Sequence, residues 1–110
     1  MDTWILDEHV ARFNEGVRSG DFGPMLDGFT DDAVMTFAGV PIGPFVGREE
    51  IGRAYAEQPP DDEIRILGVP AIEEGTIVVD YAWSAAGTRA GPMLLTPADG
   101  RIARLTVTFE

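Results

Sequence analysis

Apolar residues recur with a helical period near the start of the chain. Spacings of four, three and four place one set on a single helix face: Leu6, Val10, Phe13 and Val17. Asp2 or Thr3 can cap this helix, and Gly20 is expected to end it. The pattern therefore predicts a first helix with one buried face and one solvated face.

Two more helices are predicted before the middle of the chain. Asp21 is placed to cap a short helix of residues 22–26, which a proline in its first turn prevents from growing longer. Gly47 begins a third helix, which the Pro59-Pro60 pair ends. Its apolar residues stand at helical spacing: Ile51, Ala54 and Tyr55.

The remaining periodic segments favour β-structure. Residues 33–37 predict one strand, and four more are predicted over residues 64–72, 76–84, 89–95 and 102–109. Short connections containing glycine join the last four, so neighbouring strands should be antiparallel. The loop 38–47 holds three glycines and two prolines and is expected to have no regular structure. Helices followed by a curved antiparallel sheet indicate an α+β domain with its three helices on one face of the sheet.

Composition narrows the classes of function. At 110 residues the chain is expected to be a single domain, 1–110, and it has no cysteine, which excludes disulfides, thiolate metal sites and cysteine nucleophiles. Eight arginines stand against nineteen acidic residues, and the net charge of -11 repels phosphate backbones and anionic headgroups. We therefore expect neither nucleic acid nor a membrane as partner. No secretion signal or membrane-spanning run is visible, so a soluble, cytoplasmic protein is expected.

Four sequence motifs together resemble the nuclear transport factor 2-like superfamily, in its SnoaL-like and ketosteroid isomerase-like branches. They are Gly20-Asp21 after the first helix, the segment Phe29-Thr30-Asp31-Asp32-Ala33, Gly47 with Ile51, and the closing stretch from Asp99 to Leu105. The resemblance covers nearly the whole chain and implies a cone, in which a bent sheet wraps around the first helix. It also implies a pocket that opens into the cone and a dimer formed through the outer face of the sheet.

The same resemblance can be tested at the positions where the ketosteroid isomerases carry their catalytic groups. Those enzymes use a carboxylate base and an oxyanion hole made of a tyrosine and a protonated aspartate. Phe13 stands at the tyrosine position and Phe37 at the base position, and the third group falls near Pro92, Met93 or Thr96. Because a phenyl ring neither accepts nor donates a proton, we expect that proton-transfer route to be absent.

Alternation along the predicted strands indicates which side chains face the interior of the cone. Tyr81 and Trp83 share one face of their strand. Asp80 points to the outer face, where it can pair with Arg104 or Arg65 or lie at a dimer interface. Ordinary core packing is the alternative role for several of the inward residues. The aromatic and aliphatic lining of the predicted ligand pocket is Phe13, Phe29, Phe37, Tyr55, Tyr81, Trp83, Met93 and Val107.

His9 is the only histidine, and it lies at the edge of the apolar face of the first helix. A partly exposed edge residue is the simpler interpretation, and the single polar group of the pocket is the other. One histidine without spaced carboxylates makes no metal site, so we expect neither a metal nor a cofactor.

Three functions remain open on the sequence alone. The first is a small-molecule pocket protein that binds a hydrophobic ligand, with no assigned reaction or catalytic residues. The second is a small isomerase, polyketide cyclase or epoxide hydrolase-type enzyme that uses His9, Tyr55, Tyr81 or Asp80. The third is a non-catalytic, dimeric interaction module. A homodimer is expected in any case through outer-face residues that are small and not strongly polar: Val78, Ala82, Thr106 and Thr108.

Overall fold

The computed structural model describes residues 3–110 and contains the three predicted helices. Helix α1 spans Trp4–Ser19. Thr3 precedes it, but its side chain makes no capping hydrogen bond, and the alternative cap, Asp2, lies outside the described residues. Gly20 ends the helix as predicted, with a positive φ of 83° that a residue without a side chain adopts at low cost.

The two shorter helices begin close to their predicted positions. Helix α2 spans Gly23–Leu26, one residue shorter than expected, and Asp21 Oδ1 accepts a hydrogen bond from the Gly23 N–H at 2.9 Å. Helix α3 spans Arg48–Glu57 and follows Gly47, whose φ of 92° turns the chain into the helix. It ends just before the two prolines.

Six strands form one sheet in the order β2-β1-β6-β5-β4-β3. Their bounds are β1 Phe29–Ala38, β2 Phe45–Val46, β3 Ile64–Glu73, β4 Thr76–Trp83, β5 Arg89–Ala98 and β6 Arg101–Thr108. Strands β3 to β6 form the predicted antiparallel meander. Strand β1 instead pairs with β6 in parallel, so the sheet is mostly rather than wholly antiparallel.

Two expectations for the first half of the sheet are wrong. Strand β1 starts at Phe29, four residues before the predicted start, and an irregularity in its pairing with β6 separates Phe29 from Val34. The loop after β1 also contains a strand, because Phe45 and Val46 pair with Met35 and Val34. A strand of two residues is too short to produce a recognisable alternation, and only its partner strand defines it.

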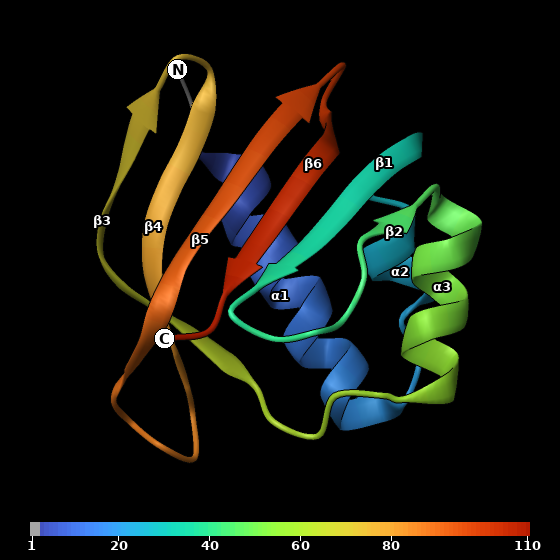
Figure 1. Ribbon diagram of the computed structural model, residues 1–110, viewed down its shortest axis with the longest axis horizontal. Helices are drawn as coiled ribbons and strands as arrows, with labels where there is room; N and C mark the ends of the chain where they lie inside the picture. The colour runs from blue at the N-terminus through green and yellow to red at the C-terminus, as the bar shows by residue number, and fades with distance from the viewer. Residues whose placement is uncertain (1–2) are drawn as a thin grey trace.

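The helices gather on one face of the curved sheet, as predicted (Figure 1). Helix α1 crosses behind the middle of the sheet, and α2 and α3 lie beside the edge formed by β2 and β1. Fully buried side chains from helices and strands fill the space between the layers: Leu6, Met25, Phe29, Met35, Ile51, Ile77, Leu95, Ile102 and Leu105. Among residues 3–110, no helix covers the opposite face of the sheet in this view.

Two polar contacts fix the chain where the layers meet. On α1, Asn14 accepts a hydrogen bond from the Ile64 N–H at 2.8 Å and donates one to the Ile64 carbonyl at 3.0 Å, which ties the start of β3 to the helix. At the other end of the fold, the Phe109 N–H donates to the Ala38 carbonyl at 2.8 Å. A Cβ added at Gly39 would overlap the backbone oxygen of Phe109, so a glycine is needed there. These contacts position Ile64 and Phe109, which both line the site described next.

Candidate functional site

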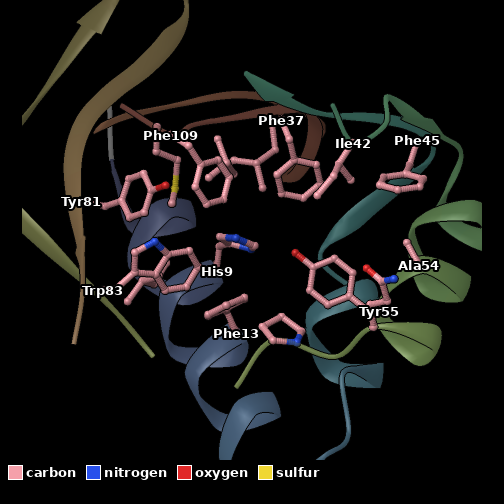
Figure 2. Close-up of a pocket in the computed structure, with 16 residues that line it drawn as sticks. His9, Phe13, Phe37, Ile42, Phe45, Ala54, Tyr55, Tyr81, Trp83 and Phe109 are labelled. Atoms are coloured by element: carbon pink, nitrogen blue, oxygen red, sulfur yellow. The ribbon is translucent and has the colours of Figure 1, made fainter. Parts of the chain in front are cut away.

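A pocket of about 240 Å³ lies between α1, α3 and the concave face of the sheet. Every layer of the fold contributes to it, from His9 and Phe13 on α1 to Tyr55 on α3 and Met93 on β5. Figure 2 shows Tyr55 approaching from the α3 side and Trp83 from the opposite side, with the His9 ring between them. The side chains around the pocket are predominantly hydrocarbon.

Seven of the eight residues predicted to line a pocket come together here: Phe13, Phe37, Tyr55, Tyr81, Trp83, Met93 and Val107. Phe29 is the exception. It is fully buried in the core and lies at the first position of β1, opposite Ile102, whereas the pocket is at the other end of this strand pair, where Phe37 lies opposite Val107. Phe29 contacts the site only indirectly, because its ring packs edge-on against His9 at a centroid distance of 5.7 Å.

Five aromatic side chains form a continuous wall along one side of the pocket, and we call Tyr81, Trp83, Phe109, Phe37 and Phe45 the aromatic wall. Successive rings contact one another at centroid distances of 5.7, 6.1, 6.2 and 6.1 Å. Two of these contacts are edge-to-face and one is stacked, and aromatic pairs favour edge-to-face and offset-stacked arrangements. The wall therefore gives the pocket a continuous aromatic surface.

Two tyrosine hydroxyls near the pocket are directed at protein atoms. The Tyr81 hydroxyl donates to the Thr108 carbonyl at 3.0 Å, and burial raises the pKa of Tyr81 to about 12. The Tyr55 hydroxyl lies 3.6 Å from Met35 Sδ, a weak acceptor, and burial raises the pKa of Tyr55 well above its usual value. Both groups stay protonated at neutral pH, and neither is a base there.

His9 is buried, contrary to the simpler expectation of a partly exposed edge residue. Only 5% of its surface is accessible, because the curved sheet closes over this edge of α1. Its Nδ1 has no hydrogen-bond partner among residues 3–110. Burial, and to a lesser degree the Arg12 guanidinium, lowers the pKa of His9 to about 4. The imidazole is therefore neutral near pH 7 and offers one donor and one acceptor.

Asp80 lies outside the pocket, as the alternation on β4 predicts. The prediction of its ion-pair partner, however, is wrong. Its carboxylate pairs at 3.0 Å with Arg89 and not with Arg104 or Arg65. The pairing of β4 with β5 shifts its register just after Tyr81, which brings Arg89 opposite Ala82 and within reach of Asp80. Asp80 therefore has a surface ion pair on the outer face of the sheet.

Six lining residues were not predicted from the sequence: Ile42, Phe45, Ala54, Gln58, Pro60 and Ile64. Leu105 and Phe109 also line the pocket, and the alternation along the last strand places both on its inner face with Val107. Ala54 and Gln58 carried a usable signal, because they are four residues apart on one helix face. Ile42 and Phe45 carried none, since they belong to the irregular segment between β1 and α3. Long-range folding alone brings that segment over the pocket.

Other kinds of site find no support in the described part of the chain. Residues 3–110 contain no group of three histidine, aspartate or glutamate side chains arranged to hold a metal ion. Within the same residues, no helix is both long enough and apolar enough to cross a bilayer.

Comparison with known proteins shows which family and which solved structures this chain resembles. The SnoaL-like domain family matches residues 10–109, whereas curated proteins give no significant match. A SnoaL-like protein of unknown function from Burkholderia thailandensis is similar at a TM-score of 0.72, with 16% identity over 99% of this chain and 97% of that one. An NTF2-like protein from Anabaena variabilis is similar at a TM-score of 0.68, with 18% identity over 97% of this chain and 87% of that one.

A third similar structure is that of TerC, which was co-crystallised with polyporic acid. Its TM-score is 0.63, and its 19% identity covers 96% of this chain and 92% of that one. Identities this low establish a common fold and no common reaction. The family match spans nearly the whole sequence, and the helices and sheet are arranged as in these structures. The chain therefore belongs to the SnoaL-like domain family and has the NTF2-like fold.

Proposed function

We propose that this protein binds a small, uncharged, aromatic molecule in the pocket. The observation that supports this most strongly is the aromatic wall, whose five rings pack against one another and also line the cavity. Ligand sites are typically concave and apolar with a few polar groups, and this pocket has that composition.

The volume of the pocket sets the size of the ligand. An engineered apolar cavity of about 150 Å³ binds benzene. The pocket here is about 240 Å³, so it offers more room than one ring requires. A molecule of two fused rings is the size that we expect it to bind.

The electrostatics favour an uncharged ligand. No aspartate, glutamate, lysine or arginine is among the lining residues within 3–110, so a charge in the pocket would lose its hydration without gaining a partner. The net charge of -11 adds a general repulsion of anions.

A substitution on α3 that fills the pocket with a larger side chain tests the proposal. The same helix offers a matched control. Ala54 is half-buried and lines the pocket, whereas Ala56 is exposed to solvent. We expect 2-methylnaphthalene to bind the wild-type protein and Ala56→Phe but not Ala54→Phe, since the new ring at position 54 occupies the pocket. Equilibrium dialysis measures the three affinities. Equal binding to all three proteins, or binding to none, contradicts the proposal.

An enzymatic function is the second candidate, and the structure leaves few residues that could carry out a reaction. Asp80 lies outside the pocket, and the hydroxyl of Tyr81 is already bonded to Thr108. Of the four residues named from the sequence, His9 and Tyr55 are the ones left that could act on a bound molecule. The fold relative TerC was co-crystallised with polyporic acid, which is consistent with a small-molecule role for this fold but assigns no reaction to this chain.

A homodimer through the outer face of the sheet is proposed as well, because no helix in the described part of the chain covers that face in Figure 1. Val78, Thr106 and Thr108 are half-buried on it, but Ala82 is already fully buried between its strand neighbours and adds no surface. Val78→Arg is expected to give monomers in sedimentation velocity, since a charge would face its own copy across the dimer axis. Unchanged sedimentation relative to the wild-type protein would remove this face from consideration.

A further inference from the structure

His9 stands out among the polar side chains of the pocket. Tyr81 is satisfied by a carbonyl and Tyr55 faces a sulfur, but His9 Nδ1 has no partner in the described chain although the residue is only 5% exposed. Leaving a buried polar group unpaired costs about 1–3 kcal/mol. Because His9 also lines the ligand-sized pocket, its imidazole is placed to pair with a polar group of a ligand.

From this geometry we infer that His9 hydrogen-bonds a hydroxyl group of the ligand, and that the ligand class is therefore aromatic alcohols, that is, phenols or enols. This inference rests on the proposed function of the pocket. A hydroxyl both donates and accepts, so it can pair with either neutral tautomer of the imidazole. A carboxylate would require a charged partner, and the pocket lining has none.

The surroundings of His9 leave room for both ring nitrogens to be satisfied. His9 also lines a second, much smaller cavity of about 20 Å³, next to Glu8 and Arg12. A cavity of that size can hold about one water molecule. A water in the small cavity can therefore pair with one ring nitrogen and leave the other for the ligand hydroxyl.

The charged and titratable groups near His9 do not take over this role. Arg12 and Glu8 lie on α1 and form an ion pair with each other, and they line the small cavity and not the main pocket. From α3, the Tyr55 hydroxyl also lines the main pocket, with Met35 Sδ as its weak acceptor. Among the titratable groups, Tyr55 is therefore the rival of His9 for a ligand hydroxyl, and the experiment has to separate the two.

A pair of probes of nearly equal shape isolates the hydrogen bond. 2-Naphthol and 2-methylnaphthalene differ by a hydroxyl in place of a methyl group, and both match the expected size. The quantity to measure is the ratio of their dissociation constants in the wild-type protein, divided by the same ratio in His9→Leu. We expect His9→Leu to lower the preference for 2-naphthol roughly fivefold, the effect of one hydrogen bond between neutral groups. His9→Gln, which keeps a donor and an acceptor, should restore part of that preference.

The outcomes separate this inference from the proposed function. If both probes bind and His9→Leu leaves their ratio unchanged, the role of His9 is wrong while the pocket function stands. If Tyr55→Phe lowers the preference for 2-naphthol over 2-methylnaphthalene and His9→Leu does not, Tyr55 binds the ligand hydroxyl. The inference is then also overturned. Failure of the wild-type protein to bind 2-methylnaphthalene would refute the proposed function itself. Circular dichroism of each variant shows whether it is folded.

Discussion

The buried imidazole of His9 makes the stability of the protein depend on pH. In the unfolded chain a histidine has its ordinary pKa of 6.5, whereas in the folded protein burial and Arg12 lower the pKa of His9 to about 4. Between these two values the unfolded state binds more protons than the folded state. The free energy of unfolding therefore falls as the pH is lowered from above 6.5 to 4.

The size of this effect follows from the two pKa values. One pKa unit corresponds to about 1.4 kcal/mol, so lowering the pKa from 6.5 to about 4 corresponds to about 3 kcal/mol. All of this loss has occurred once the pH is below about 4, and none of it is present well above 6.5. For a small domain, about 3 kcal/mol is a large share of the total stability.

Urea unfolding at pH 7, 6, 5 and 4 measures the effect when the wild-type protein is compared with His9→Leu. The many carboxylates titrate in both proteins, so their contribution largely cancels in the difference between the two free energies. The wild-type protein should lose about 3 kcal/mol relative to His9→Leu between pH 7 and pH 4. His9→Gln, which also lacks a titrating group, should follow His9→Leu. Parallel pH profiles for all three proteins would show that His9 is not buried as a neutral group.

The two contacts that fix the ends of the fold give further predictions. Asn14→Leu removes both hydrogen bonds to the backbone of Ile64, and it should lower the free energy of unfolding by about 1–3 kcal/mol in urea titrations; an unchanged midpoint would mean that water replaces them at no cost. Gly39→Ala should be more destabilising than Gly20→Ala. Both have a positive φ, but a Cβ at position 20 meets nothing, whereas one at position 39 overlaps the backbone oxygen of Phe109. The control should lose only about 1–2 kcal/mol, the cost of a left-handed residue, and equal losses in the two variants would contradict the close approach.

Much of the fold could be predicted from local pattern alone. The helix that ends at Gly20 and the meander of β3 to β6 depend on periodicity and turn residues, which are local properties of the sequence. The parallel pairing of β1 with β6 could not be predicted, because the chain between them holds a helix and several strands and no local signal specifies the partner. Strand β2 was missed for the same reason.

The candidate site was predictable where it lies on regular strands. Alternation on β4 placed Tyr81 and Trp83 toward the helices, and the structure has them there. The prediction that Phe29 lines the pocket was wrong. Alternation gives the face of the sheet on which a side chain lies, but not its position along the strand relative to the pocket. His9 was misjudged since its burial depends on how closely the sheet curves around α1, and the helical pattern contains no information on that curvature.

A crystal of the protein soaked with 2-methylnaphthalene would show whether the aromatic side chains form a ligand site. We expect the bound rings to lie inside the pocket, between Tyr55 and Trp83 and against the aromatic wall, with the outer face of the sheet unoccupied. Rings that are absent from the pocket, or that bind only on the outside of the molecule, would mean that the aromatic wall is not a binding surface.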